Sequence, residues 1–177
     1  MQRIVFAFTL ALWLTLLPHG DAVAGVPAPY AAIVIEPTGV PARHEFDLSA
    51  ALARARREHK RLYVYLGASD CPYCRKYEAF LERNAKELVP YFAAQYIVVD
   101  LRSALSVMAN QLFIRIGERT LPYADFQRAI GDERARMLVY PSVWLFDADA
   151  KPLMQMPAGT GTFQTVPEQL EILRLEQ

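Results

Sequence analysis

The sequence has only two cysteines and three histidines among its 177 residues, and this scarcity excludes two kinds of small protein. One pair of cysteines cannot form a disulfide-stapled scaffold, and a loop enclosing only two residues constrains the unfolded chain very little. A zinc site needs about four ligands. Beyond the N-terminal segment the only histidines are His44 and His59, neither at ligand spacing. We therefore expect no metal ion and no bound cofactor.

The sequence also lacks net charge, with 19 lysines and arginines against 19 aspartates and glutamates. A neutral chain offers no electrostatic attraction to nucleic acid or to a membrane surface, so we expect neither as a partner. A membrane-spanning helix needs about 20 apolar residues. No segment after residue 24 is long and apolar enough, so we expect no stable membrane insertion of the processed chain.

The one long apolar run lies at the N-terminus, where Arg3 precedes the apolar residues 4–17 and Ala22-Val23-Ala24 follows them. A positive start, a short apolar run and small residues at the cleavage spacing are typical of an export signal. We interpret residues 1–24 as a signal peptide and expect one domain outside the cytoplasm, where disulfides persist. The alternative is an uncleaved anchor, for which the apolar run is short.

The rest of the chain alternates helix and strand patterns. The proline-rich residues 25–44 predict an extended leader with one edge strand at 32–36. Apolar periodicity and β-branched runs then predict helices and strands in alternation. In chain order these are a helix over 48–60, a strand over 62–67, helices over 75–84 and 85–91, and a buried strand over 96–101. A strand–helix–strand unit of this kind requires parallel pairing of its strands.

Residues 102–139 are predicted to be mostly helical, because Leu105, Met108 and Leu112 repeat at helical spacing. Three helices are expected there: one ending near Gly117, one from Pro122 to Gly131, and a short one from Asp132 that includes Met137 and Leu138. Strands over 142–146 and 153–156 follow, joined by a turn. A capping box formed by Thr165 and Glu168 opens a last helix, to about residue 175. We expect a single domain over 45–177, with a helical insertion at about 102–135.

Both cysteines lie in the motif Ser69-Asp70-Cys71-Pro72-Tyr73-Cys74-Arg75-Lys76, where the strand over 62–67 leads into a helix. At that position the unpaired N–H groups and the dipole of a helix N-terminus favour a thiolate at Cys71, which we expect to be exposed. The thiol of Cys74, one helical turn later, is close enough to resolve a mixed disulfide. The spacing predicts a two-electron thiol–disulfide switch with Cys71 as nucleophile. The alternative is a buried, inert pair.

This order of elements, over about residues 45–176, resembles the thioredoxin superfamily, above all the exported thioredoxin-like proteins of bacteria. Cys71-Pro72-Tyr73-Cys74 matches the CPYC of glutaredoxins and of some periplasmic disulfide isomerases. Tyr140-Pro141-Ser142 stands where the family places a cis-proline facing the active cysteines. The resemblance implies an α/β three-layer sandwich, with a central mixed sheet flanked by helices. It also implies that Pro72, Tyr73, Tyr140 and Pro141 form the substrate site, with Pro141 holding the backbone open for an extended substrate segment.

Three positions need separate interpretation against this family. Thr165-Val166-Pro167 copies the triplet at the glutaredoxin cis-proline, but a helix pattern follows it, so Pro167 is assigned to the first turn of a helix. Thioredoxins bury an acidic residue six positions before the first cysteine, where it can take a proton from the second thiol; that position is Tyr65 here. Their tryptophan directly before the first cysteine is Asp70 here. Thioredoxin-like proton handling is therefore left open by the sequence.

Together these features predict a periplasmic thiol–disulfide oxidoreductase, with reduction as the favoured direction. Its expected partners are cysteine-containing protein substrates and a membrane or periplasmic redox partner. Two alternatives stay open. A thioredoxin-fold binding or assembly module would use residues 102–139 as its interface. A glutathione-dependent or iron–sulfur role, as in some glutaredoxins, is disfavoured outside the cytoplasm.

Overall fold

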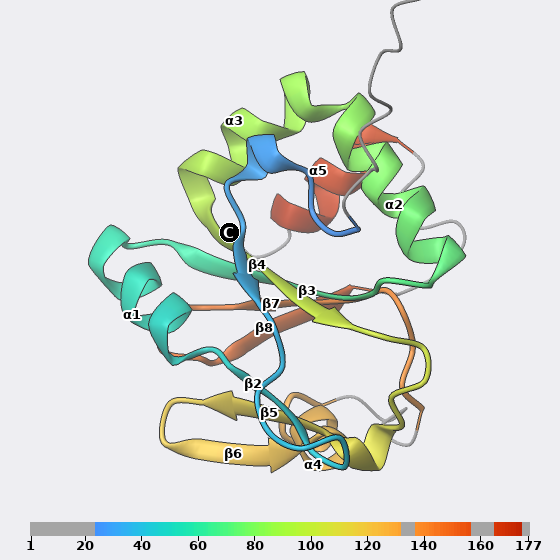
Figure 1. Ribbon diagram of the computed structural model, residues 1–177. Helices are drawn as coiled ribbons and strands as arrows, with labels where there is room; N and C mark the ends of the chain where they lie inside the picture. Colours follow the sequence, from blue (N-terminus) through green and yellow to red (C-terminus); the bar gives the residue numbers. More distant parts are fainter. Residues whose placement is uncertain (1–23, 132–136, 157–164, 175–177) are drawn as a thin grey trace, which may run out of the picture.

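The structure is a computed structural model that describes residues 24–131, 137–156 and 165–174 (Figure 1). The signal peptide expected over residues 1–24 therefore lies, apart from Ala24, outside the described residues. The start of the short helix expected at Asp132 lies outside them as well.

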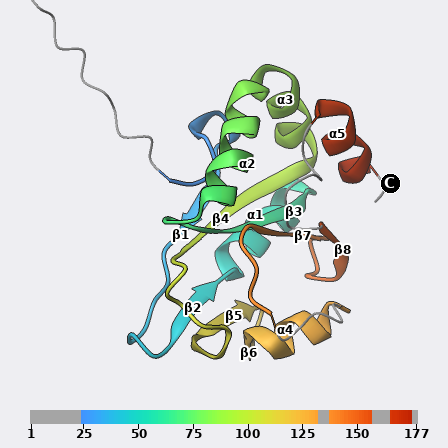
Figure 2. The same ribbon diagram turned by 90° about the vertical axis from the view of Figure 1, so that its right-hand side faces the viewer.

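A five-stranded mixed sheet with the order β1-β4-β3-β7-β8 forms the centre of the fold. Helices α2, α3 and α5 cover one face of this sheet and α1 covers the other, as Figures 1 and 2 show. The expected α/β sandwich, a mixed sheet flanked by helices, is confirmed. In chain order the elements are η1 (Ala28–Tyr30), β1 (Ile33–Ile35), β2 (His44–Asp47), α1 (Ser49–Glu58), β3 (Arg61–Ala68), α2 (Pro72–Arg83), α3 (Ala85–Gln95), β4 (Tyr96–Ser103), η2 (Ala109–Gln111), β5 (Leu112–Ile116), β6 (Arg119–Pro122), α4 (Tyr123–Ala129), β7 (Ser142–Phe146), β8 (Pro152–Met156) and α5 (Val166–Arg174).

Strand β3 lies in the middle of the sheet. It pairs parallel with β4 along its whole length and antiparallel with β7, so the parallel pairing expected of this unit is confirmed. Almost every residue of β3 and β4 is buried, which explains their continuous apolar and aromatic composition. Strand β1 pairs with β4 at the sheet edge, inside the range expected for an edge strand.

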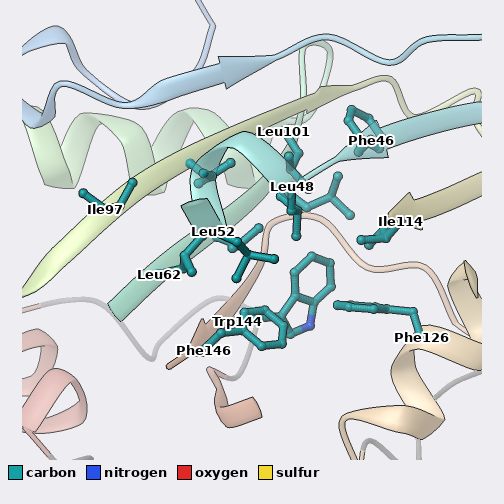
Figure 3. Close-up of a cluster of buried hydrophobic side chains, with 14 of the residues drawn as sticks. Phe46, Leu48, Leu52, Leu62, Ile97, Leu101, Ile114, Phe126, Trp144 and Phe146 are labelled. Carbon is teal, nitrogen blue, oxygen red and sulfur yellow. The ribbon is translucent and has the colours of Figure 1, made fainter. Parts of the chain in front are cut away.

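Successive side chains of β3 point alternately into two cores on opposite faces of the sheet. Leu62 and Leu66 lie with α1 in a cluster that also contains Trp144 (Figure 3). Tyr63 and Tyr65 lie in the other cluster, beneath α2, α3 and α5. This alternation directs the Tyr65 side chain toward α2, the helix that begins at the cysteines.

The prediction of a helical insertion over about 102–135 is wrong for most of this segment. Strand β4 runs to Ser103, and β5 and β6 form a hairpin that pairs with β2 in a second sheet, of order β2-β5-β6. Gly117, with φ +61°, lies between the hairpin strands instead of ending a helix. Within the described residues of this segment only α4 is α-helical, and Met137 and Leu138 are not in a helix.

The physical reason for this difference is the partner strand β2. Leu112 and Ile114 alternate with less buried residues, a period of two, and both are fully buried beside Phe46 of β2. The same apolar residues also satisfy a helical spacing when they are read together with Leu105 and Met108, both of which are exposed. The leader residues before 45 are also part of the folded domain, because they form β1 of the main sheet and the first residue of β2.

Candidate active site at the dithiol

Cys71 and Cys74 lie at the start of α2, directly after β3, as the motif predicted. Cys71 is the N-cap residue in extended conformation, and Pro72 occupies the first helical position, where the missing N–H is not needed. The backbone N–H of Cys74 donates a 3.2 Å hydrogen bond to Cys71 Sγ. Both thiols are free, and the two cysteines lie in one small buried cluster with Ala68.

The expectation that Cys71 is exposed is wrong: it is 2% exposed, and Cys74 is fully buried. The cause is the segment that precedes β7. Tyr140 packs against the small cluster formed by Ala68 and the two cysteines. Its carbonyl oxygen lies 3.7 Å from Cys71 Sγ, and its hydroxyl lies 2.8 Å from Ser103 Oγ at the end of β4.

The Tyr140–Pro141 peptide bond is cis, the isomer that the resemblance implied. Pro167 lies in the first turn of α5, and the Thr165–Glu168 capping box is present, so that assignment is also confirmed. Of the residues expected at the substrate site, Tyr140 lies against the cluster that contains both cysteines. Tyr73 instead turns outward from α2, with its side chain 51% exposed and the Lys76 ammonium 5.4 Å from its ring.

Asp70 has a structural use at the position where thioredoxins carry tryptophan. Its Oδ1 accepts a 2.8 Å hydrogen bond from the backbone N–H of Leu105, which ties the dithiol motif to the segment after β4. Leu105 remains half-exposed, and Val139, which directly precedes Tyr140, is about one-third exposed. Exposed apolar side chains therefore stand on each of the three segments that surround Cys71.

The thiol of Cys74 is held in its neutral form. Burial raises the pKa of Cys74 to about 12, and the hydrogen bond from the Ala68 N–H, 3.5 Å away, opposes this only in part. Hydrogen bonding with the hydroxyl of Tyr65 also lowers the pKa of Cys74, but by less than burial raises it. A buried neutral thiol is a poor nucleophile until its proton is removed.

Two buried carboxylates near the dithiol were missed by the sequence reasoning. Glu78 on α2 accepts hydrogen bonds from the Tyr65 hydroxyl at 2.8 Å and from Arg75 Nη2 at 2.7 Å, and burial raises its pKa. Asp100 lies opposite Tyr65 in the β3–β4 register, and burial raises its pKa too. Two features of the sequence could have revealed them: Glu78 lies on the apolar face of α2, and Asp100 is a charged residue inside a β-branched strand.

Within the described ranges, no group of three or more histidine, cysteine, aspartate or glutamate residues is arranged to hold a metal ion. None of the helices in the same ranges has the length and apolar character of a membrane span.

A mixed sheet between helices, with a dithiol at a helix N-terminus and a cis-proline loop beside it, defines a thioredoxin-like protein. The chain belongs to the thioredoxin-like domain family, whose model matches residues 48–171. A solved structure similar to it is a thioredoxin-fold protein from Helicobacter pylori, at 16% identity and a TM-score of 0.36. The similarity covers 58% of this chain and 62% of that chain, less than two thirds of its length. No curated protein matches the sequence. Family and dithiol together indicate a thiol–disulfide redox function in general terms.

Proposed function

We propose that the protein is a thiol–disulfide oxidoreductase for protein substrates, with Cys71 as nucleophile and Cys74 as resolving thiol. The observation that carries this proposal is the contact set of Cys71. Its sulfur accepts the Cys74 N–H at the helix start and lies beside the Tyr140 carbonyl. A backbone N–H donor at a helix N-terminus also stabilises the sulfur anion that must attack a disulfide.

The proposed reaction is a two-step exchange. The thiolate of Cys71 attacks one sulfur of a client disulfide, the client S–S bond breaks, and the other client sulfur leaves as a thiol. Cys74 then loses its proton and attacks Cys71 Sγ, which breaks the mixed disulfide and releases the second client thiol. The client gains two electrons, and the protein is left with a Cys71–Cys74 disulfide. The reverse sequence oxidises a dithiol client.

A protein client, in place of a small ionic thiol, is supported by the exposed apolar side chains around the site. Tyr73 and Leu105 are each about half-exposed, at 51% and 50%, and Val139 is 36% exposed. Burying these side chains against apolar surface of a partner would stabilise the complex. An extended client segment that passes Cys71 would meet the Tyr140 carbonyl, a hydrogen-bond acceptor at the start of the β7 loop.

The location and the direction of electron flow form the finer part of the proposal. A signal-like segment over residues 1–24 supports action in the periplasm, after removal of that segment. A reductase there needs a membrane or periplasmic partner that restores the dithiol, and we favour this direction. A binding or assembly module that carries the thioredoxin fold is the alternative.

The proposed function is tested by catalysed reduction of a protein disulfide, such as that of insulin, with a dithiol reductant as electron source. The wild-type protein is expected to accelerate the reaction, and Cys71→Ser is expected to fall to the uncatalysed rate. Leu105→Ala should raise KM for the protein substrate, whereas the matched control Val34→Ala, which trims an exposed apolar residue on β1, should not. Equal rates for wild type and Cys71→Ser would refute the proposal. Full biological activity of the double cysteine variant would favour the binding module.

A further inference from the structure

The hydroxyl of Tyr65 lies between the sulfur of Cys74 and the carboxylate of Glu78. It donates a 2.8 Å hydrogen bond to Glu78 Oε1, and hydrogen bonding between this hydroxyl and the Cys74 sulfur lowers the pKa of Cys74. A phenolic hydroxyl can accept one hydrogen bond while it donates another. The three groups therefore form a continuous chain from the Cys74 thiol, through the Tyr65 oxygen, to a buried carboxylate.

Gly67 fixes the position of the Tyr65 ring in this chain. Both residues point to the same face of β3, because they are two apart on one strand. A Cβ added at Gly67 would lie 2.6 Å from Tyr65 Cε1 and 2.9 Å from its hydroxyl oxygen. The tyrosine lies over the backbone of Gly67, and only glycine leaves the room for it.

Beyond Glu78 the chain of groups opens into a cavity of about 280 Å³, whose lining includes the polar side chains of Tyr65, Glu78, Asp100, Arg75 and Arg102. Two buried atoms of its lining, Asp100 Oδ1 and Arg75 Nε, have no hydrogen-bond partner within the part of the chain that is described. Buried polar atoms are normally satisfied by protein or by water. A cavity of this size, with unpartnered polar atoms in its lining, has room for several water molecules.

We propose that Tyr65 and Glu78 form a proton relay between Cys74 and this cavity. The inference rests on the proposed function, because the relay serves the step in which Cys74 resolves a mixed disulfide. In that step the Cys74 S–H proton passes to the Tyr65 oxygen as the Tyr65 O–H proton passes to Glu78 Oε1. Cys74 becomes a thiolate and attacks Cys71 Sγ, Tyr65 stays neutral, and the neutral Glu78 returns its proton through the cavity. Tyr65 touches the reacting sulfur, whereas Glu78 acts through Tyr65.

The groups that face Glu78 set how readily it accepts the proton. Arg75 on α2 and Tyr65 on β3 bind its ionised form, as does the backbone N–H of Gly25. Asp100 on β4, itself paired with Arg102 at 3.2 Å, opposes the ionised form by its charge. Burial is the largest influence and raises the pKa of Glu78, which makes this carboxylate a better base than an exposed glutamate.

The relay is tested by stopped-flow reaction of the reduced protein with dithiobis(nitrobenzoate). One thionitrobenzoate is released when Cys71 attacks the reagent, and a second when Cys74 resolves the mixed disulfide. Tyr65→Phe and Glu78→Gln are expected to leave the first release within about two-fold and to slow the second at pH 7 by roughly 100-fold. The deficit should shrink as the pH rises toward the pKa of Cys74, about 12, because ionisation then needs no base.

Tyr63→Phe is the matched control, because Tyr63 is a buried tyrosine on the same face of β3 that bonds to Tyr77 and not to Cys74. It should leave both phases unchanged. Gly67→Ala keeps both relay side chains but displaces the tyrosine, so it should slow the second phase selectively. Glu78→Asp should recover part of the rate lost in Glu78→Gln. Wild-type second-phase rates in Tyr65→Phe or Glu78→Gln, or equal slowing of both phases, would overturn the relay. A wild-type protein without a first phase would instead overturn the proposed function.

Discussion

The sulfur of Cys71 lies 3.7 Å from the carbonyl oxygen of Tyr140, although the two residues are 69 positions apart in the sequence. The sheet brings them together, because β3 leads into the dithiol and β7 begins just after the proline, and the two strands are antiparallel neighbours with Leu66 opposite Ser142. The proposed nucleophile therefore meets a backbone acceptor from a different part of the chain. This juxtaposition is the physical basis for the proposed client site.

The assignment of roles to the two cysteines predicts different trapping behaviour. Cys74→Ala should leave Cys71 able to form mixed disulfides that no intramolecular thiol can release, so clients accumulate as higher-mass species on non-reducing gels. Cys71→Ala should trap far less, because burial raises the pKa of Cys74 to about 12 and keeps it neutral. Adding a reductant should remove the trapped species. Equal trapping by the two variants would contradict the assignment.

The buried carboxylate of Asp100 predicts a pH-dependent effect on stability. Its pKa is raised by burial, so its stabilising contribution is complete below its unfolded pKa, about 3.9, and is lost as the pH rises through its folded pKa. Asp100→Asn, which keeps an acceptor for the Val26 N–H, should therefore gain stability relative to wild type between pH 4 and pH 7. The gain is about 1.4 kcal/mol for each pH unit that separates the folded and unfolded pKa values.

Urea unfolding at the two pH values measures this gain. Asp149→Asn, on the exposed turn between β7 and β8, is the control and should show a much smaller change. If the stability of Asp100→Asn relative to wild type stays constant or falls as the pH rises, the buried charge of Asp100 does not destabilise the folded protein.

The segment over residues 102–139 is predicted to be part of the main core, and not a separable appendage. Phe126 of α4 is 1% exposed and packs edge-on against Trp144 of β7, with ring centroids 5.1 Å apart. Phe126→Ala should cost about 3–5 kcal/mol in a single cooperative unfolding transition. Leu105→Ala, at an exposed position in the same segment, should stay within about 0.5 kcal/mol of wild type. Two separate transitions would contradict a shared core.

Export processing is predicted to leave Gly25 as the first residue. The fold holds Val26, whose N–H donates a 3.1 Å hydrogen bond to Asp100 Oδ2, and hydrogen bonding by the Gly25 N–H lowers the pKa of Glu78. Cleavage after Ala24 would place the new ammonium group beside these two carboxylates. N-terminal sequencing of the periplasmic protein checks this, and an intact Met1 on a membrane-bound product would refute it.

The sequence predicted the main sheet well, because its strands carry their own signal. The run Ser142–Phe146 became β7 with the same bounds, and the C-x-x-C turn lies at the helix start where the motif requires it. Such elements are fixed by local composition and by short-range spacing. The hairpin of β5 and β6 was not predicted, because the choice between helix and strand for Leu112 and Ile114 depends on β2, which pairs with them from far upstream.

The candidate site divides in the same way. The cysteines and the Tyr140 loop could be named from motifs, whereas the contact between Tyr65 and Glu78 could not. That contact depends on which face of β3 the tyrosine occupies, on the glycine two residues later and on the orientation of α2. Burial of Cys71 under Tyr140 likewise follows from the packing of distant segments.

The most direct test of the central claim is the redox equilibrium of the purified protein in glutathione buffers of increasing oxidation, with free thiols counted by alkylation and mass spectrometry. A dithiol switch predicts one transition in which both thiols are lost together. The ratio of oxidised to reduced protein should change tenfold for about every 29.6 mV, as a two-electron couple requires. The product should be a Cys71–Cys74 disulfide. Thiols that persist across the whole range, or oxidation only to a glutathione adduct on Cys71, would contradict the account.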